Sequence, residues 1–225
     1  MTGPDDDETR RPFASSPCMA HEADPMAEPR DVAGWRRAER KRLRAERQTS
    51  SVEARRAIGA ALSDHLRTLL EERLEGARGK VFSAYWPIKG EPDLRGLMAE
   101  LHESGVAVAL PIVETKAAPL VFRRWTPQTR MVRGDWNIPV PPPEAEAVTP
   151  DITLAPLMGW DGAGYRLGYG GGYFDRTLAA LAPRPVTIGI GVQSARLDTI
   201  HPQPHDIPLD VILTEAGVQV AREAP

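Results

Sequence analysis

The amino-acid sequence predicts a single α/β domain of three layers, with a central, mostly parallel β-sheet between helices on both faces. Three observations support this. Short apolar runs with strand character alternate with amphipathic helical segments along most of the chain, which is the pattern of a helix-covered sheet. The length of 225 residues suits one domain with a sizeable core. The composition, 41% hydrophobic and 26% charged, is that of an ordinary globular protein.

The first 33 residues differ from the remainder of the chain. They are rich in Asp, Glu, Pro and Ala, and Phe13 is their only aromatic residue. Such a segment cannot bury enough apolar surface to offset the entropy lost on ordering. We therefore expect a disordered tail over residues 1–33 and one folded domain over residues 34–225.

Charge and cysteine content exclude several classes of protein. A net charge of −3 gives no general preference for nucleic acids or membranes, and the single Cys18 cannot form a disulfide framework. No run approaches eighteen apolar residues, and acids and prolines stand where a signal peptide has its apolar stretch. We expect a cytoplasmic protein.

The first predicted helix is strongly basic, with seven cations in the thirteen positions from Trp35 to Arg47. Arg36, Arg40, Arg44 and Arg47 recur at helical spacing and would share one face. Three interpretations compete for this face: a solvated surface, a nucleic-acid contact, or cations that reach the phosphates of a nucleotide.

Helices and strands then alternate. Residues 51–74 predict an amphipathic helix with Ser51 as N-cap, and a second helix follows Asp93, its expected cap. Strands are expected over residues 80–86, 106–110, 120–125, 151–156 and 186–192, with short closing strands at 211–213 and 218–220. Pro87 and Pro111 are expected to end the first two strands. The proline-rich residues 126–150 predict a long loop over one edge of the sheet, pinned by Trp136 and Ile138.

A glycine-rich loop is the strongest functional indication. Six of the eleven residues from Gly162 to Gly172 are glycine, between a predicted strand at 151–156 and a predicted helix at 173–182. Free backbone N–H groups and a helix N-terminus both favour a bound phosphate. The alternative is a mobile surface loop, but three charged residues and three tyrosines within the twelve positions from Tyr165 to Arg176 favour a ligand site.

The segment RLGYGGGYFDR, from Arg166 to Arg176, resembles the motif of 5-formyltetrahydrofolate cyclo-ligases, also called 5,10-methenyltetrahydrofolate synthetases. Supporting matches are RRAER at 36–40, the G-x-x-x-I-x-x-P pattern at 134–141, and HDIPLDVILTE at 205–215. The resemblance covers about Trp35 to Ala221. It implies the fold of the NagB, RpiA and CoA-transferase group, and a ring closure that depends on ATP and Mg²⁺.

In that reaction the N5-formyl oxygen of 5-formyltetrahydrofolate attacks the γ-phosphate, and N10 then displaces phosphate to give 5,10-methenyltetrahydrofolate. The resemblance gives the catalytic roles to Arg166 and Tyr173. It assigns ATP to Arg36, Arg40, Arg166, Leu167, Gly168, Tyr169, Gly170, Gly171, Gly172 and Phe174. Arg36 replaces a lysine of the family pattern, and a register one turn later, at Arg40 and Arg44, stays open. Some relatives carry a basic residue where this chain has Gly171.

Glu91, Trp125 and Tyr173 are the expected folate contacts, although packing explains Trp125 equally well. Asp175 and Asp206 are the expected Mg²⁺ ligands, with Asp210 as a substitute. Asp175 is also explained as an acid favoured by the first turn of a helix.

Two other functions stay open: a different small-molecule kinase or ligase on the same scaffold, and a non-catalytic relative that binds nucleotide, folate or RNA. The expected partner is 5-formyltetrahydrofolate, with or without a polyglutamate tail. We expect no nucleic acid, no membrane, and a monomer or weak dimer.

Overall fold

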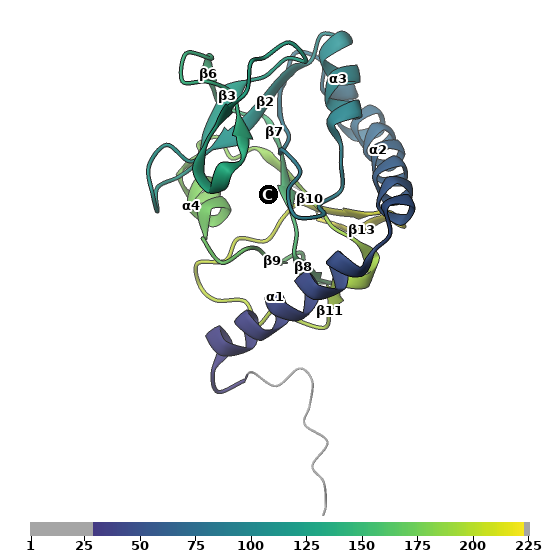
Figure 1. Ribbon diagram of the computed structural model, residues 1–225, viewed down its shortest axis with the longest axis vertical. Helices are drawn as coiled ribbons and strands as arrows, with labels where there is room; N and C mark the ends of the chain where they lie inside the picture. The colour runs from purple at the N-terminus through teal and green to yellow at the C-terminus, as the bar shows by residue number, and fades with distance from the viewer. Residues whose placement is uncertain (1–28, 223–225) are drawn as a thin grey trace, which may run out of the picture.

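An eight-stranded sheet forms the centre of the protein (Figure 1). The structure is a computed structural model and describes residues 29–222. The strand order is β13-β12-β10-β7-β1-β2-β3-β6. The strands comprise β1 (Val81–Ser83), β2 (Ala107–Ile112), β3 (Val121–Arg124), β6 (Ala147–Val148), β7 (Ile152–Pro156), β10 (Val186–Ile190), β12 (Val211–Thr214) and β13 (Gly217–Ala221). The five strands from β12 to β2 are parallel, and β13, β3 and β6 add antiparallel pairs. The predicted mostly parallel sheet is confirmed.

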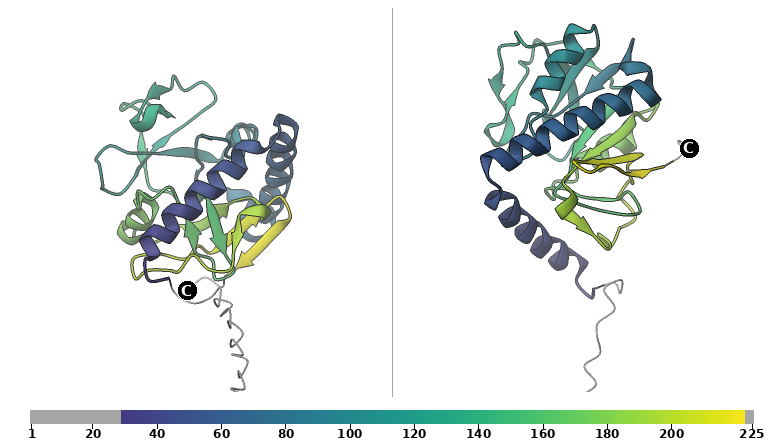
Figure 2. Two further views of the ribbon diagram at one scale, coloured as in Figure 1. Left: turned by 60° about the horizontal axis from the view of Figure 1, so that its bottom comes forward. Right: turned by 90° about the vertical axis from the view of Figure 1, so that its right-hand side faces the viewer.

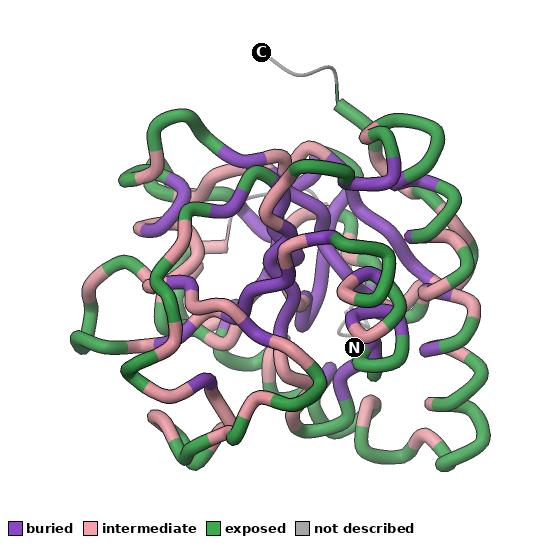
Figure 3. The backbone as a smooth tube through the Cα atoms, turned by 90° about the horizontal axis from the view of Figure 1, so that it is seen from above, coloured by how far each residue is buried: buried purple, intermediate pink, exposed green. Residues whose placement is uncertain are grey.

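Two apolar cores lie on opposite faces of this sheet, because successive side chains of a strand point to opposite sides. Ile152 and Leu154 of β7 belong to the first core, together with buried leucines of α2 (Val52–Leu74) and α3 (Arg95–Glu103). The second core contains Ala155 and Ile212, with residues from α1 (Val32–Thr49) and α4 (Tyr173–Ala180). Figure 2 shows α1 and α2 in succession along one side of the molecule, and Figure 3 shows the buried strands at its centre.

The helix starts follow mostly from their capping residues. Ser51 caps α2 as predicted, since its side chain accepts from the Ala54 N–H. Helix α1 begins at Val32, because the Asp31 side chain accepts from the Gly34 N–H at 2.7 Å, so the folded part starts before residue 34. Residues 1–28 of the tail expected over 1–33 lie outside the described residues. The N-cap position of α3 is Leu94, not the expected Asp93, and it makes no side-chain capping bond. The Asp93 side chain instead accepts from the Arg95 N–H.

Two expectations about strands were wrong in detail. Strand β2 continues through Pro111 to Ile112. It can do so because β1 pairs with β2 only as far as Ala109, so the missing N–H of proline interrupts no parallel pairing. The predicted strand at 80–86 is limited to Val81–Ser83.

Several short elements were not predicted. A three-stranded sheet has the order β11 (Arg196–Leu197), β8 (Gly159–Asp161) and β9 (Arg166–Leu167). Strands β8 and β9 precede the glycine loop in the chain, and β11 follows β10. The proline-rich segment contains a small hairpin of β4 (Val132–Arg133) and β5 (Pro139–Val140) as well as β6. The remaining short helices are η1 (Glu75–Ala77), η2 (Asp135–Asn137) and η3 (Gln193–Ala195).

Trp136 does not pin the proline-rich segment by burial, because it is 64% exposed. Within residues 29–222, the structure contains no helix with the length and apolar character that a membrane span requires.

Candidate active site

A cavity of about 850 Å³ lies beyond the carboxyl ends of β1, β2 and β7. Its walls come from one face of α1, the loop after β1, the end of β2, residues 132–143, the glycine loop and the segment before β12. Loops after different parallel strands meet at this edge of a sheet, which is where α/β proteins bind ligands. The glycine loop, Glu91 and Asp206 all line this one cavity, as predicted.

The glycine loop leaves β9 and ends at the start of α4. Gly170 and Gly172 have φ values of +96° and +63°, a conformation that favours glycine, and Gly172 is the N-cap of α4. The carbonyl oxygen of Gly168 accepts from Arg40 Nε at 2.7 Å, and the Arg40 guanidinium lies against Gly170. The loop is therefore held open by an arginine of the basic helix, with the first turn of α4 beside it.

The arginine face of α1 points toward the site. Arg36, Arg40 and Arg44 line the cavity, and Arg47 donates to the Tyr169 hydroxyl at 3.2 Å. Burial lowers the pKa of Arg40, and the neighbouring Arg36 charge adds to this effect. Arg44 makes no hydrogen bond or ion pair within the described part of the chain, and is free to meet an anion. Of the three interpretations of this face, the geometry favours phosphate contacts.

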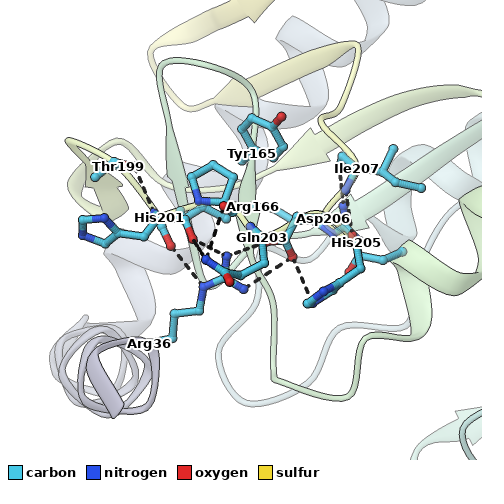
Figure 4. Close-up of polar contacts among 12 residues, drawn as sticks. Arg36, Tyr165, Arg166, Thr199, His201, Gln203, His205, Asp206 and Ile207 are labelled. Carbon is cyan, nitrogen blue, oxygen red and sulfur yellow. Dashed lines mark hydrogen bonds and ion pairs between the residues drawn. The ribbon is translucent and has the colours of Figure 1, made fainter. Parts of the chain in front are cut away.

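Arg36 joins the basic helix to the segment before β12 (Figure 4). Its Nε donates to the Ile200 carbonyl at 3.1 Å, its Nη2 donates to the His201 carbonyl at 2.9 Å, and its guanidinium forms an ion pair with Asp206. Burial raises the pKa of Asp206, but hydrogen bonds from Arg36 and the Gln203 N–H outweigh burial and leave the pKa below its usual value. Asp206 is therefore a carboxylate at neutral pH.

Arg166 makes a second ion pair, with Asp175 of α4. Their atoms Nη2 and Oδ1 are 2.9 Å apart, and Arg166 Nη1 donates to the Ile207 carbonyl. Asp175 Oδ1 also accepts from the Ile207 N–H at 3.1 Å. The Arg166 guanidinium lies 5.6 Å from the Phe174 ring centre. Burial lowers the pKa of Arg166, and the Asp175 charge opposes that shift.

The two expected Mg²⁺ ligands, Asp175 and Asp206, lie on the wall of the same cavity. Residues 29–222 contain no cluster of three or more His, Cys, Asp or Glu side chains placed to hold a metal. Mg²⁺ on a nucleotide needs one or two carboxylates, phosphate oxygens and waters, so this pair fits such an ion, which would share the carboxylates with arginines. Asp210 does not line the cavity, because it accepts from Thr187 and pairs with Arg184.

A buried carboxylate, Glu91, lines the cavity next to Tyr169 of the glycine loop. Glu91 is 7% exposed, and its Oε1 accepts from the Tyr169 hydroxyl at 2.7 Å, while its Oε2 accepts from the Ile88 N–H at 2.9 Å. Burial raises the pKa of Glu91, and the hydrogen bonds from Tyr169 and the Ile88 N–H partly oppose this. Burial and the Glu91 charge also raise the pKa of Tyr169 far above its usual value.

Aromatic rings lie beside the glycine loop. The Tyr173 ring packs over Gly171, so that a Cβ at position 171 would come within 2.8 Å of it. Trp136 meets the Tyr173 ring edge-on at 5.6 Å between ring centres, and Trp86 also lines the cavity.

Two residues that were expected to contact a ligand, Trp125 and Leu167, do not line the cavity. Trp125 is 7% exposed in the core beneath α3, so packing explains it. Leu167 alternates with Arg166 along β9, and its side chain therefore packs into the second core.

The cavity residues not predicted include Trp86, Lys89 and most of the hairpin at 132–140. The sequence signal for the contact between Arg47 and Tyr169 was the helical spacing that places Arg47 on the same face as Arg40 and Arg44.

Comparisons with known proteins identify the family of this chain. The model of the 5-formyltetrahydrofolate cyclo-ligase family matches residues 32–215. The 5-formyltetrahydrofolate cyclo-ligase of Mycolicibacterium smegmatis is 31% identical over 183 residues, covering 77% of this chain and 94% of the relative. The cyclo-ligase of Haemophilus influenzae is 30% identical, covering 68% and 83%.

Two solved structures share the fold. The 5,10-methenyltetrahydrofolate synthetase of Aquifex aeolicus has a TM-score of 0.69 at 30% identity, covering 84% of this chain and 94% of that protein. The synthetase of Mycoplasma pneumoniae has a TM-score of 0.65 at 23% identity, covering 80% and 98%, and supports the fold alone.

Proposed function

The chain belongs to the 5-formyltetrahydrofolate cyclo-ligase family, and we propose that its cavity carries out the ATP-dependent conversion of 5-formyltetrahydrofolate to 5,10-methenyltetrahydrofolate. The observation that carries this proposal is the meeting of the glycine loop, two aspartates and the buried Glu91 in one cavity of about 850 Å³. Such a volume is in the range of sites that enclose organic ligands.

We assign the triphosphate to the wall formed by the glycine loop and α1. The loop presents backbone N–H groups beside the first turn of α4, and Arg40 and Arg44 add positive charge. Arg36 and Arg166 also line the cavity, and their ion pairs with Asp206 and Asp175 hold the loops in place. Gly171 brings no cation of its own, so α1 supplies the charge at this wall.

We assign the pterin to the wall that contains Glu91. A carboxylate at this position can accept from the ring N–H and amino donors of the pterin. Tyr173 lines the same cavity at the start of α4, directly after the glycine loop, where it can hold the folate against that loop.

The two walls together align three reacting groups. The formyl oxygen on N5 bonds to the γ-phosphorus as the bond to the β,γ-bridging oxygen breaks and ADP leaves. N10 then attacks the formyl carbon, its proton is released, and phosphate departs with the former formyl oxygen to leave the methenyl bridge. Phosphoryl transfer of this kind depends on positioning and charge neutralisation. Asp175 and Asp206 are the side chains that would hold Mg²⁺, whose contribution is to neutralise phosphate charge. We propose the cytoplasm as the location.

The test is an absorbance assay for the methenyl product. We expect the product band to grow only when ATP, Mg²⁺ and 5-formyltetrahydrofolate are all present. The Glu91→Gln variant should raise KM for the folate, with a smaller effect on KM for ATP. A folded protein that forms no product with all three present would contradict the proposal.

A further inference from the structure

Arg47 lies at the end of a hydrogen-bonded chain that leads into the cavity. Its Nη1 donates to the Tyr169 hydroxyl at 3.2 Å, and that hydroxyl donates to Glu91 Oε1 at 2.7 Å. Its Nη2 donates to the Leu157 carbonyl at 2.5 Å, which fixes the guanidinium between the glycine loop and the start of the small sheet. Arg47 itself does not line the cavity, so it touches neither proposed substrate.

The donor and acceptor properties of the side chains fix the direction of the hydrogen bonds from Arg47 through Tyr169 to Glu91. A guanidinium only donates hydrogen bonds, so the Tyr169 oxygen must accept from Arg47. The single hydroxyl proton of Tyr169 is then available for Glu91 alone. Glu91 Oε2 accepts from the Ile88 N–H, so both oxygens of the carboxyl act as hydrogen-bond acceptors in this arrangement.

The surroundings of Glu91 explain why the direction of the Tyr169 hydrogen bond matters. The carboxyl is 7% exposed, and burial favours its protonated form. The cations near it are Arg47 from α1 and Lys89 from its own loop. The remaining titratable neighbours are Tyr169 and Tyr85, and the Tyr85 hydroxyl donates to the Pro92 carbonyl. Of these two cations, Arg47 is the one that the described hydrogen bonds link to Glu91, through the Tyr169 hydroxyl.

The aliphatic part of Arg47 has a second contact. Its Cγ lies 3.4 Å from the position that a Cβ would take on Gly90, the residue before Glu91. Arg47 thus supports the Glu91 loop from outside the cavity while its guanidinium acts through Tyr169. Methionine would keep much of the aliphatic contact and lose the guanidinium.

We propose that Arg47 is a positioning residue, which directs the Tyr169 proton toward Glu91 and so holds that carboxylate as an acceptor for the pterin. The inference rests on the proposed function for the identity of the ligand, but the effect of Arg47 on Glu91 does not. A protonated Glu91 would present an O–H donor toward donors of the pterin and would bind it poorly.

The first experiment needs no ligand. Carbon-13 NMR follows the Glu91 carboxyl through a pH titration in the full-length protein, with the Glu91→Gln variant to identify its resonance. We expect Arg47→Met to raise the titration midpoint of Glu91, and Arg47→Lys to bring it back toward the wild-type midpoint. Arg42→Met is the matched control, because Arg42 lies on the exposed side of α1 and pairs with Glu39 and Glu46.

The second experiment measures binding by calorimetry for 5-formyltetrahydrofolate and, separately, for a non-hydrolysable ATP analogue. We expect Arg47→Met to weaken folate binding about tenfold at neutral pH, the loss typical of a hydrogen bond to a charged group. Analogue binding should change less than about twofold, because Arg47 does not line the cavity and so touches no phosphate.

An unchanged Glu91 midpoint in Arg47→Met would overturn the proposal. Equal losses of affinity for both ligands, with a lower melting temperature and no change of midpoint, would also overturn it and leave Arg47 a structural role in docking α1. If the wild-type protein fails to bind 5-formyltetrahydrofolate, the proposed function fails, while the NMR titration still decides whether Arg47 controls Glu91.

Discussion

Arg166 and Asp175 form an ion pair across the two ends of the glycine loop, with 2.9 Å between Nη2 and Oδ1. Arg166 belongs to β9, which precedes the loop, and Asp175 belongs to α4, which follows it. Both also bond to the backbone of Ile207. The pair therefore fixes the width of the loop and joins it to the segment that carries Asp206.

The first prediction concerns this pair. Asp175→Asn leaves the buried Arg166 charge without its counter-ion, and the free energy of unfolding should fall by about 3–5 kcal/mol. Urea denaturation measures the change. Glu100→Gln is the comparison, because it breaks an exposed ion pair with Arg67 and should cost less than about 1 kcal/mol. Similar losses in the two variants would contradict the prediction.

The same variant also tests the proposed metal site. If Asp175 holds Mg²⁺ on the nucleotide, Asp175→Asn should lose most of its turnover under conditions where it is still folded, and excess Mg²⁺ should restore part of it. Turnover equal to that of the wild type in folded Asp175→Asn would remove Asp175 from the metal site.

The second prediction is a pH dependence set by Glu91. Burial raises its pKa above the ordinary value of 4.5, so the folded protein holds the Glu91 proton to a higher pH than the unfolded chain. The favourable contribution of the protonated carboxyl to stability is complete below the unfolded pKa, and it is lost as pH rises through the folded pKa. The free energy of unfolding of the wild type, minus that of Glu91→Gln, should therefore decrease as pH rises from about 4.5.

Urea denaturation of both proteins at a series of pH values measures this difference. Subtracting the Gln variant cancels the titration of all other groups that the substitution does not disturb. A difference that is constant, or that grows with pH, would show that the folded-state pKa of Glu91 is not raised.

The sequence predicted those parts of the fold that have a strong local pattern. The spacing of Leu62, Leu66 and Leu69 gave α2, and the apolar runs gave the parallel strands, because burial on both faces requires continuous apolar residues. The small sheet β11-β8-β9 was missed, since strands of two or three residues such as Arg166–Leu167 have no periodicity. Its pairings depend on long-range contacts.

The candidate site shows a similar division. The glycine loop was found because its composition is unusual, and the arginine face of α1 because Arg36, Arg40, Arg44 and Arg47 keep helical spacing. The bond between Tyr169 and Glu91 joins residues 78 positions apart, which no local pattern encodes. Trp125 was assigned to the site on residue type alone, although packing in the core explains a buried tryptophan equally well.

The third prediction compares two glycines of the loop. A Cβ at Gly171 would lie 2.8 Å and 2.9 Å from atoms of the Tyr173 ring, whereas a Cβ at Gly168 would meet nothing within 4 Å. Neither residue has a positive φ, so the two alanine variants differ mainly in how closely the new Cβ meets neighbouring atoms. Gly171→Ala should lower the free energy of unfolding by about 1–3 kcal/mol more than Gly168→Ala.

Gly171→Ala should also raise KM for the folate, because Tyr173 must move to make room. Urea denaturation and steady-state kinetics provide the two readouts. Equal stability of the two alanine variants would show that Tyr173 does not rest on Gly171.

The last prediction concerns Arg40. Its Nε donates to the Gly168 carbonyl, its guanidinium lies against Gly170, and it lines the cavity, so it can hold the loop and face a phosphate at once. At ATP concentrations near 100 times Kd, binding should raise the wild-type free energy of unfolding by about 2.7 kcal/mol. If Arg40→Met weakens ATP binding tenfold, the gain at the same concentration falls to about 1.4 kcal/mol. Arg42→Met, a loss of the same charge from the exposed face of α1, should keep the full gain. Denaturation with and without ATP separates this effect from any change in the intrinsic stability of either variant. The same gain in both variants would mean that the phosphates do not lie against Arg40, and the nucleotide would then have to be placed elsewhere in the cavity.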